Sequence, residues 1–131
     1  MTELEKLAAG LPYDFYDAVV GAVKEHAARL CARYNALPVD AYEEQARLLK
    51  EELLGSYVDD VLVQQPFFCD NGRNIHVGSD FLTNYHVTIL DVAPVHIGDH
   101  VLIGPNTLIS TVNHPMTPAG RRKHLGICKP V

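Results

Sequence analysis

The sequence predicts an α+β protein in which a helical amino-terminal segment is followed by a parallel β-helix. Residues 1–55 are rich in helix formers, and their apolar positions recur at helical spacing. From residue 56 onward, β-branched residues, glycine and proline dominate, and a six-residue repeat emerges. We therefore expect a helical extension over residues 1–55 and a partial β-helix, including a loop for substrate binding, over residues 56–131.

The amino-terminal segment is expected to form two or three amphipathic helices. Val19 and Val23 belong to one apolar stripe with helical spacing. Gly10 marks a first break between helices and Pro38 a second one. Gly55 is a typical end signal for the last helix.

The six-residue repeat is seen in two registers of inward-facing positions. The first register is Val77, Thr83, Ile89, Ile97, Ile103 and Ile109, and the second is Ile75, Phe81, Val87, Val95, Val101 and Thr107. Ten of these twelve positions are apolar and two are threonine, with a single step of eight residues across 90–95. Each short strand would send alternate residues inward, and Gly78, Gly98 and Gly104 would relieve backbone strain at the corners.

Ordinary antiparallel hairpins also alternate valine and isoleucine with turn residues. Two registers that persist over six repeats favour the β-helix. The spacing does not determine its handedness, and the general rule for parallel crossovers favours the right hand.

Composition excludes several classes of function. The chain has a formal net charge of -5 and no block rich in lysine and arginine, which argues against nucleic acid as a partner. It has neither an apolar run of membrane-spanning length nor a signal peptide, so we expect a cytoplasmic protein without a membrane partner. Cys31, Cys69 and Cys128 are expected to be free thiols in a reducing compartment.

An ordered series of motifs runs along the whole chain. It includes Tyr13-Asp14, the block 66–72, the segments 74–78 and 97–99, and His114-Pro115. In these motifs the chain resembles the maltose/galactoside O-acetyltransferase family of hexapeptide-repeat proteins. The resemblance implies a left-handed β-helix and a homotrimer with active sites between neighbouring subunits. It also implies transfer of an acetyl group from acetyl-CoA, as co-substrate, to a hydroxyl of a mono- or disaccharide of the maltose, glucose or galactoside type.

The resemblance also assigns residues. His114 matches the family's catalytic histidine, and a histidine suits a general base because its unperturbed pKa lies near neutrality. Asp70, Asn84 and Asp91 match positions associated with sugar binding, and Asp17 is implied to reach the same groove. Carboxylates and amides are suited to bind several hydroxyls at once.

Two of these carboxylates have structural alternatives. The run Asp70-Asn71-Gly72 is also a typical turn, and Asp91 could cap the longer corner before Pro94. Both alternatives stay open on the sequence alone.

The chain departs from the family pattern at two places. It reads Gly126-Ile127-Cys128 where many relatives carry a Glu-Tyr pair before the Lys-Pro step, which leaves the choice of acceptor open. Relatives also continue with further coils that line the CoA groove, so we expect a β-helix incomplete at its carboxyl end. For the same reason we expect weak or absent acetyl-CoA binding by these 131 residues alone. The cofactor-binding residues are therefore unassigned. The alternative function is a non-catalytic β-helix scaffold or partner subunit.

A metal protein similar to the γ-class carbonic anhydrases is a further rival. His76 and His96 occupy equivalent repeat positions and could stack one coil apart on the outer face. Zinc would need neutral imidazoles that converge in tetrahedral geometry. Surface histidines are the favoured interpretation, and no metal is expected.

Overall fold

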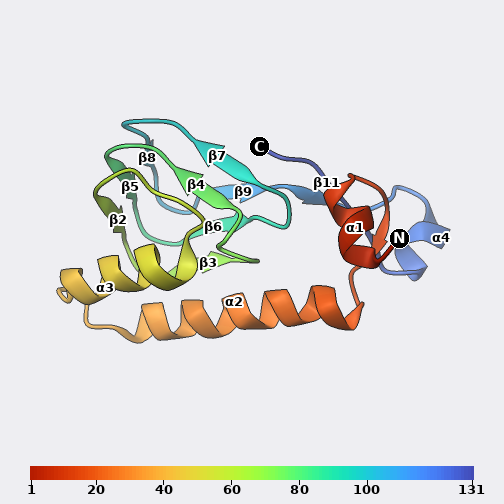
Figure 1. Cartoon of the computed structure of the whole chain (residues 1–131), viewed down its shortest axis with the longest axis horizontal. Helices are drawn as coiled ribbons and strands as arrows, with labels where there is room; N and C mark the ends of the chain where they lie inside the picture. Colours follow the sequence, from red (N-terminus) through yellow and green to blue (C-terminus); the bar gives the residue numbers. More distant parts are fainter.

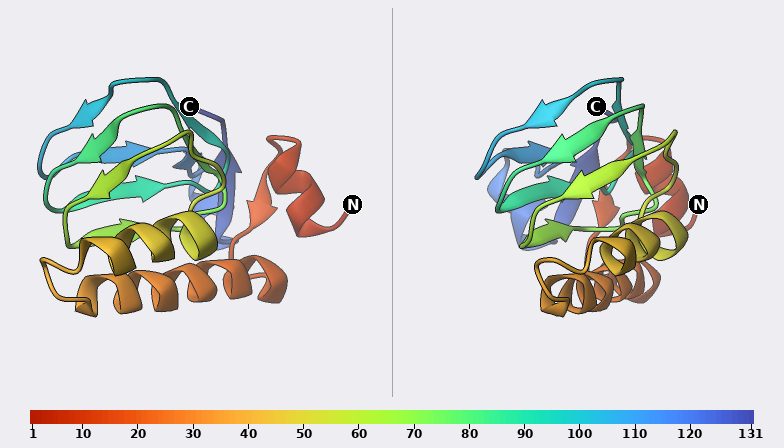
Figure 2. Two further views of the ribbon diagram at one scale, coloured as in Figure 1. Left: turned by 60° about the vertical axis from the view of Figure 1, so that its left-hand side comes forward. Right: turned by 90° about the vertical axis from the view of Figure 1, so that its left-hand side faces the viewer.

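Three coils of a parallel β-helix stack on helices that lie across one end of the stack (Figure 1, Figure 2). The structure, a computed structural model, describes residues 1–131. The helical elements are α1 (Glu3–Ala8), α2 (Ala18–Ala36), α3 (Tyr42–Leu48), the π-helical turn η1 (Leu49–Leu53) and α4 (Pro118–Arg122). The strands are β1 (Tyr13–Asp14), β2 (Val61–Val63), β3 (Phe67–Cys69), β4 (Ile75–Val77), β5 (Phe81–Thr83), β6 (Val87–Leu90), β7 (Val95–Ile97), β8 (Leu102–Ile103), β9 (Leu108–Ser110), β10 (Val112–Asn113) and β11 (Leu125–Cys128). None of the helices is long and apolar enough to cross a membrane.

Each coil repeats after 20 residues. Val61 pairs with Phe81 and Ile75 with Val95 in parallel register, a separation of 20 residues in both cases. The three faces of the β-helix are the ladders β2–β5–β8, β3–β6–β9 and β4–β7. The single step of eight in the sequence repeat is the longer corner between β6 and β7.

The two inward registers predicted from the sequence are confirmed. In the first two coils seven of these residues are at most 4 % exposed, and Ile97 is half-buried; the seven are Ile75, Val77, Phe81, Thr83, Val87, Ile89 and Val95. Val101 and Ile109 in the third coil are only half-buried, because no further coil stacks on them. Burial of the apolar side chains of neighbouring coils against each other stabilises the stack.

The predicted role of the corner glycines is wrong. None of Gly78, Gly98 and Gly104 has a positive φ. Gly78 is instead required by close packing, because a Cβ there would lie against the carbonyl of Gly98 in the next coil. The corner residues with positive φ are Asp80, His86, His100 and Asn106. Gly98 and Gly104 have open space where a Cβ would lie.

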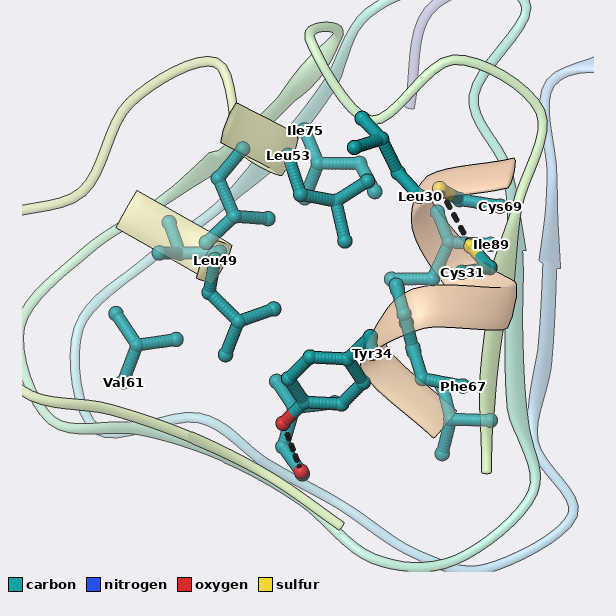
Figure 3. Close-up of a cluster of buried hydrophobic side chains, with 14 of the residues drawn as sticks. Leu30, Cys31, Tyr34, Leu49, Leu53, Val61, Phe67, Cys69, Ile75 and Ile89 are labelled. Carbon is teal, nitrogen blue, oxygen red and sulfur yellow. Dashed lines mark hydrogen bonds between the residues drawn. The ribbon is translucent and has the colours of Figure 1, made fainter. Parts of the chain in front are cut away.

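Helix α2 closes the end of the β-helix that begins with β2. Figure 3 shows Tyr34 and Cys31 of α2 among the buried side chains of the coils and of η1. The Tyr34 hydroxyl donates to the carbonyl oxygen of Val63. The Asn35 side chain binds both the N–H and the carbonyl oxygen of Phe67, so the helix is fixed to β3 by paired hydrogen bonds.

A small antiparallel sheet, β1–β11–β10, joins the two ends of the chain. Tyr13 of β1 pairs with Gly126 of β11, and a side chain at Gly126 would collide with the Tyr13 ring. The Cys128 thiol donates to the Tyr13 hydroxyl. The segment that departs from the family pattern therefore forms β11, and it places α1 beside the coils (Figure 1).

We predict that Thr83→Val stabilises the protein. The Thr83 hydroxyl is buried inside the β-helix without a hydrogen-bond partner. Replacing it by a methyl group of the same shape removes an unsatisfied polar group, which is expected to add about 1 kcal/mol to the free energy of unfolding in urea. Thr88→Val, on the outward side of β6, is the matched control and should change little. A Thr83→Val variant that is less stable than the wild type would contradict this assignment.

Candidate active site

A cleft of about 480 Å³ opens between the helices and the coils, and it contains two of the residues predicted from the sequence. Its walls come from α1, from β1 and the residue after it, and from the first turns of α2. The other side is formed by the loop after β3, the end of β6 with the corner that follows, β10 and His114. Asp70 and His114 both line it. Residues from both halves of the sequence thus form one site.

His114 is held in a defined orientation at the rim of the cleft. It directly follows β10, whose pairing with β11 brings the Leu125 carbonyl oxygen to 2.9 Å from His114 Nδ1. A carbonyl oxygen only accepts, so Nδ1 carries the proton and Nε2 has a free lone pair in the neutral ring. The Phe15 ring packs against the imidazole in an edge-type arrangement, with 5.2 Å between the ring centroids. The side chain is therefore oriented as a base acting through Nε2.

Asp70 places a mostly buried carboxylate in the same cleft. Its side chain is 12 % exposed and makes no hydrogen bond within the chain, and Lys24 Nζ lies 3.9 Å from Oδ1. Burial raises the pKa of Asp70, the Lys24 charge opposes this rise, and Asp91 adds to it. Because Lys24 is largely exposed and only loosely paired, the carboxylate oxygens stay free to accept hydrogen bonds from a ligand.

Asp91 lies beneath the loop that carries Asp70 and does not face the cleft. Its Oδ1 accepts from the N–H groups of Asp70 at 3.0 Å and Asn71 at 2.9 Å, and its Oδ2 accepts from the Gly72 N–H at 2.6 Å. Its side chain is fully buried. Burial raises the pKa of Asp91, while the N–H donors oppose this rise. Asp91 was expected either to bind sugar or to cap the corner before Pro94. The contacts support a structural role, but the corner that Asp91 stabilises is the one that carries Asp70 in the preceding coil.

Asp17 and Asn84 do not line the cleft. Asp17 is the N-cap of α2, where its Oδ1 accepts from the N–H groups of Val19 and Val20. Asn84 lies at the corner between β5 and β6, where its Oδ1 accepts from the Tyr85 N–H at 2.7 Å. A single chain thus brings together His114 and Asp70 and leaves Asn84 at another corner of the coil.

The sequence interpretation missed several residues that line the cleft. Phe15 and Lys24 come from the helical segment, where no motif distinguished them from other surface residues. Asn71 and Asn74 flank the Asp70 loop, and the Asn74 amide donates to the carbonyl oxygens of Asp91 and Val92. The available signals were the Asp70-Asn71-Gly72 turn for Asn71 and the motif segment 74–78 for Asn74.

The predicted stacking of His76 and His96 is confirmed, with 4.9 Å between the ring centroids and 14° between the ring planes. His76 Nδ1 lies 2.8 Å from the Ser56 hydroxyl. No group of three or more histidine, cysteine, aspartate or glutamate side chains converges as a metal site would require.

Comparison with known proteins identifies the family. Residues 6–57 match the maltose acetyltransferase hexapeptide capping motif. Nodulation protein L of Rhizobium meliloti (strain 1021) is 38 % identical over 130 residues, which are 99 % of this chain and 70 % of that protein. The chain belongs to the maltose/galactoside O-acetyltransferase family of hexapeptide-repeat proteins. It spans about 70 % of the length of this relative.

Solved structures of this family agree with the fold. The crystal structure of a maltose O-acetyltransferase from Clostridium difficile 630 has a TM-score of 0.94 at 35 % identity, covering 99 % of this chain and 69 % of that one. A hexapeptide-repeat acetyltransferase from Vibrio cholerae O1 biovar eltor, in complex with acetyl-CoA, has a TM-score of 0.83 at 38 % identity, with the same coverage. The expected left-handed parallel β-helix of this acetyltransferase family is thereby confirmed.

We predict that Asp91→Asn destabilises the protein. An asparagine offers one acceptor oxygen where the carboxylate offers two, so at least one buried N–H of the Asp70 loop loses its partner. The expected loss is about 2–4 kcal/mol in the free energy of unfolding, measured in urea. The control is Asp60→Asn, an exposed aspartate of the first coil. Equal stability of the two variants would show that Asp91 does not organise the loop.

Proposed function

We propose that this chain provides the acceptor side of an enzyme that transfers an acetyl group from acetyl-CoA to a hydroxyl of a mono- or disaccharide. The observation that carries the proposal is the shared cleft of His114 and Asp70. There, a base with a free Nε2 faces the same space as a buried carboxylate without a hydrogen-bond donor. The acetyl-CoA complex of the Vibrio cholerae relative supports the donor, and the maltose O-acetyltransferase relative supports a sugar acceptor.

In the proposed reaction, His114 Nε2 accepts the proton of a sugar hydroxyl while the hydroxyl oxygen attacks the thioester carbonyl of acetyl-CoA. The hydrogen bond from Nδ1–H to the Leu125 carbonyl oxygen keeps Nε2 aimed at the hydroxyl and strengthens as the ring becomes positively charged. The tetrahedral intermediate then expels the CoA sulfur, which takes the proton from Nε2. The products are the acetylated sugar and free CoA, and no acyl-enzyme forms.

Asp70 is proposed to bind a second hydroxyl of the same sugar. A buried carboxylate with free oxygens accepts strong hydrogen bonds from hydroxyl donors, and this would fix which hydroxyl reaches His114. Asp91 contributes by holding the Asp70 loop through its three N–H bonds. Asp17 retains an Oδ2 outside its helix cap, and we propose that it contacts the acceptor at the edge of the cleft.

Asn84 fits this proposal in a homotrimer. Because it lies at another corner of the coil, we propose that it contacts the acceptor bound in the cleft of a neighbouring copy. A row of outward leucines, Leu62, Leu82 and Leu102, runs along the face β2–β5–β8, which ends at the corner that carries Asn84. Leu102 is 70 % exposed in the single chain. Such a row supports an interface between copies, because contact would remove apolar surface from water.

We predict that His114→Ala lowers kcat by about 10²–10⁴-fold, since this is the usual contribution of a positioned general base. Acceptor binding should change little, because Asp70 is unaffected. The rate is measured as CoA release from acetyl-CoA with excess sugar. His26→Ala on the exposed side of α2 is the control. An unchanged rate for His114→Ala would show that His114 is not the general base. If the wild-type chain itself shows no turnover, the non-catalytic scaffold or partner subunit is favoured.

The part of the cleft wall away from Asp70 and His114 is apolar. It indicates a more specific class of acceptor than sugars in general. Ten of its sixteen lining residues are hydrophobic, including Leu4 and Leu7 of α1 and Val20 and Val23 of α2. This wall adjoins the polar end that holds Asp70 and His114. We propose that the preferred acceptor is a glycoside whose alkyl or aryl group lies along this wall.

We predict that octyl glucoside, below its micellar concentration, binds about 10–100-fold more tightly than methyl glucoside, since burial of two or three of its additional CH₂ groups contributes about 2 kcal/mol. Isothermal titration calorimetry on the wild-type chain measures both affinities. Val23→Asn should reduce the difference, whereas Val19→Asn, an exposed residue of the same helix, should preserve it. Equal affinity for the two glycosides would argue against the apolar subsite but not against acetyl transfer.

A further inference from the structure

Two cysteines that are distant in the sequence meet inside the protein. Cys31 lies on α2 and Cys69 is the last residue of β3, and their Sγ atoms are 3.6 Å apart (Figure 3). Both side chains are buried, with residue exposures of 3 % and 8 %. A disulfide bond has an S–S length of about 2.05 Å, so closing this pair needs a shift of only about 1.5 Å.

The surroundings isolate this pair from other thiols. Leu30 and Phe67 are among the buried apolar residues of the same cluster. Cys128, the third cysteine, lies in a separate cluster and is bonded to the Tyr13 hydroxyl. Each of the two cysteines thus has the other as its neighbouring thiol. Their apolar environment leaves little room for a bulky thiol such as glutathione.

The two sulfurs are not equivalent. Either thiol can donate in the contact between the two sulfurs. The hydrogen bond with Cys69 lowers the pKa of Cys31 against the opposing effect of burial. The same hydrogen bond, together with burial, raises the pKa of Cys69. Because the thiolate is the nucleophile, Cys31 is the member that reacts first.

We propose that Cys31 and Cys69 form a reversible disulfide when a hydroperoxide oxidises the protein. The Cys31 thiolate attacks one peroxide oxygen, which gives a sulfenic acid and releases water or an alcohol after protonation. The Cys69 sulfur then attacks the sulfenic sulfur, forms the S–S bond and expels hydroxide, which takes the Cys69 proton and leaves as water. Two thiols are oxidised and one peroxide is reduced. A dithiol reverses the reaction by exchange.

The disulfide would link the oxidation state of Cys31 and Cys69 to the position of the two elements that form the cleft walls. Cys69 immediately precedes Asp70, and Cys31 shares α2 with Lys24, which lies beside Asp70. The disulfide would therefore tie the helix that forms one side of the cleft to the strand that carries the other side. It would also close a loop of about 39 residues in the unfolded chain, which is expected to raise the Tm.

The experiment treats the full chain with hydrogen peroxide or diamide and then quenches and denatures it. The expected result is a mass loss of 2 Da and the loss of two of three thiols. Tryptic mapping under non-reducing conditions should join the peptide 30–33 to the peptide 51–73, and dithiothreitol should separate them. The oxidised form should melt about 5–15 °C higher than the reduced form.

Matched variants separate this pair from other thiol chemistry. Cys128→Ser should still lose 2 Da, whereas Cys31→Ser and Cys69→Ser should not. Two results would each overturn the proposal: a disulfide that includes Cys128, or three intact thiols in wild-type protein whose exposed methionines are already oxidised. Acetyl transfer is measured separately, so failure of the thiol proposal leaves the proposed function untouched.

Discussion

The coils depend on one repeated constraint, which is the separation of 20 residues between side chains that lie against each other in successive coils. In parallel strands, a shift by one residue would turn every inward side chain outward. The constraint reaches the corners as well, because Gly78 has no room for a Cβ against Gly98 of the next coil. The loop with Asp70 and the corner with Asp91 keep their positions because both belong to this register.

The candidate site lies where the regular coils meet helices and strands that are not part of the 20-residue repeat. Asp91 uses its carboxylate to hold the backbone of the preceding coil, so that Asp70 next to it stays free for a ligand. On the other side, β10 and β11 leave the coil pattern and orient His114 through the Leu125 carbonyl oxygen. The two aspartates therefore differ in their hydrogen bonds. The carboxylate of Asp91 accepts three hydrogen bonds from backbone N–H groups, whereas that of Asp70 accepts none from the chain.

Much of the fold was predictable because its signal is periodic. The inward registers followed from residues such as Ile75 and Val87, whose burial needs only alternation and spacing. The positive φ of His86 and His100 was not predictable, since nothing in the repeat favours these residues over glycine at a left-handed corner. His114 and Asp70 were identified by resemblance, but whether they share a cleft depends on tertiary contacts that no local pattern encodes.

The pairing of Tyr13 with Gly126 has a consequence for the order of folding. These residues are 113 positions apart, so the contact closes a very long loop and carries a high entropic cost until the coils have formed. On a ribosome, β11, the strand that pairs with Tyr13, emerges long after α1, α2, α3 and the first two coils. The coils can assemble as each one is synthesised, whereas the imidazole of His114 acquires its orienting carbonyl only when β11 arrives. The geometry of the candidate site is therefore completed late, after nearly all of the preceding structure has formed.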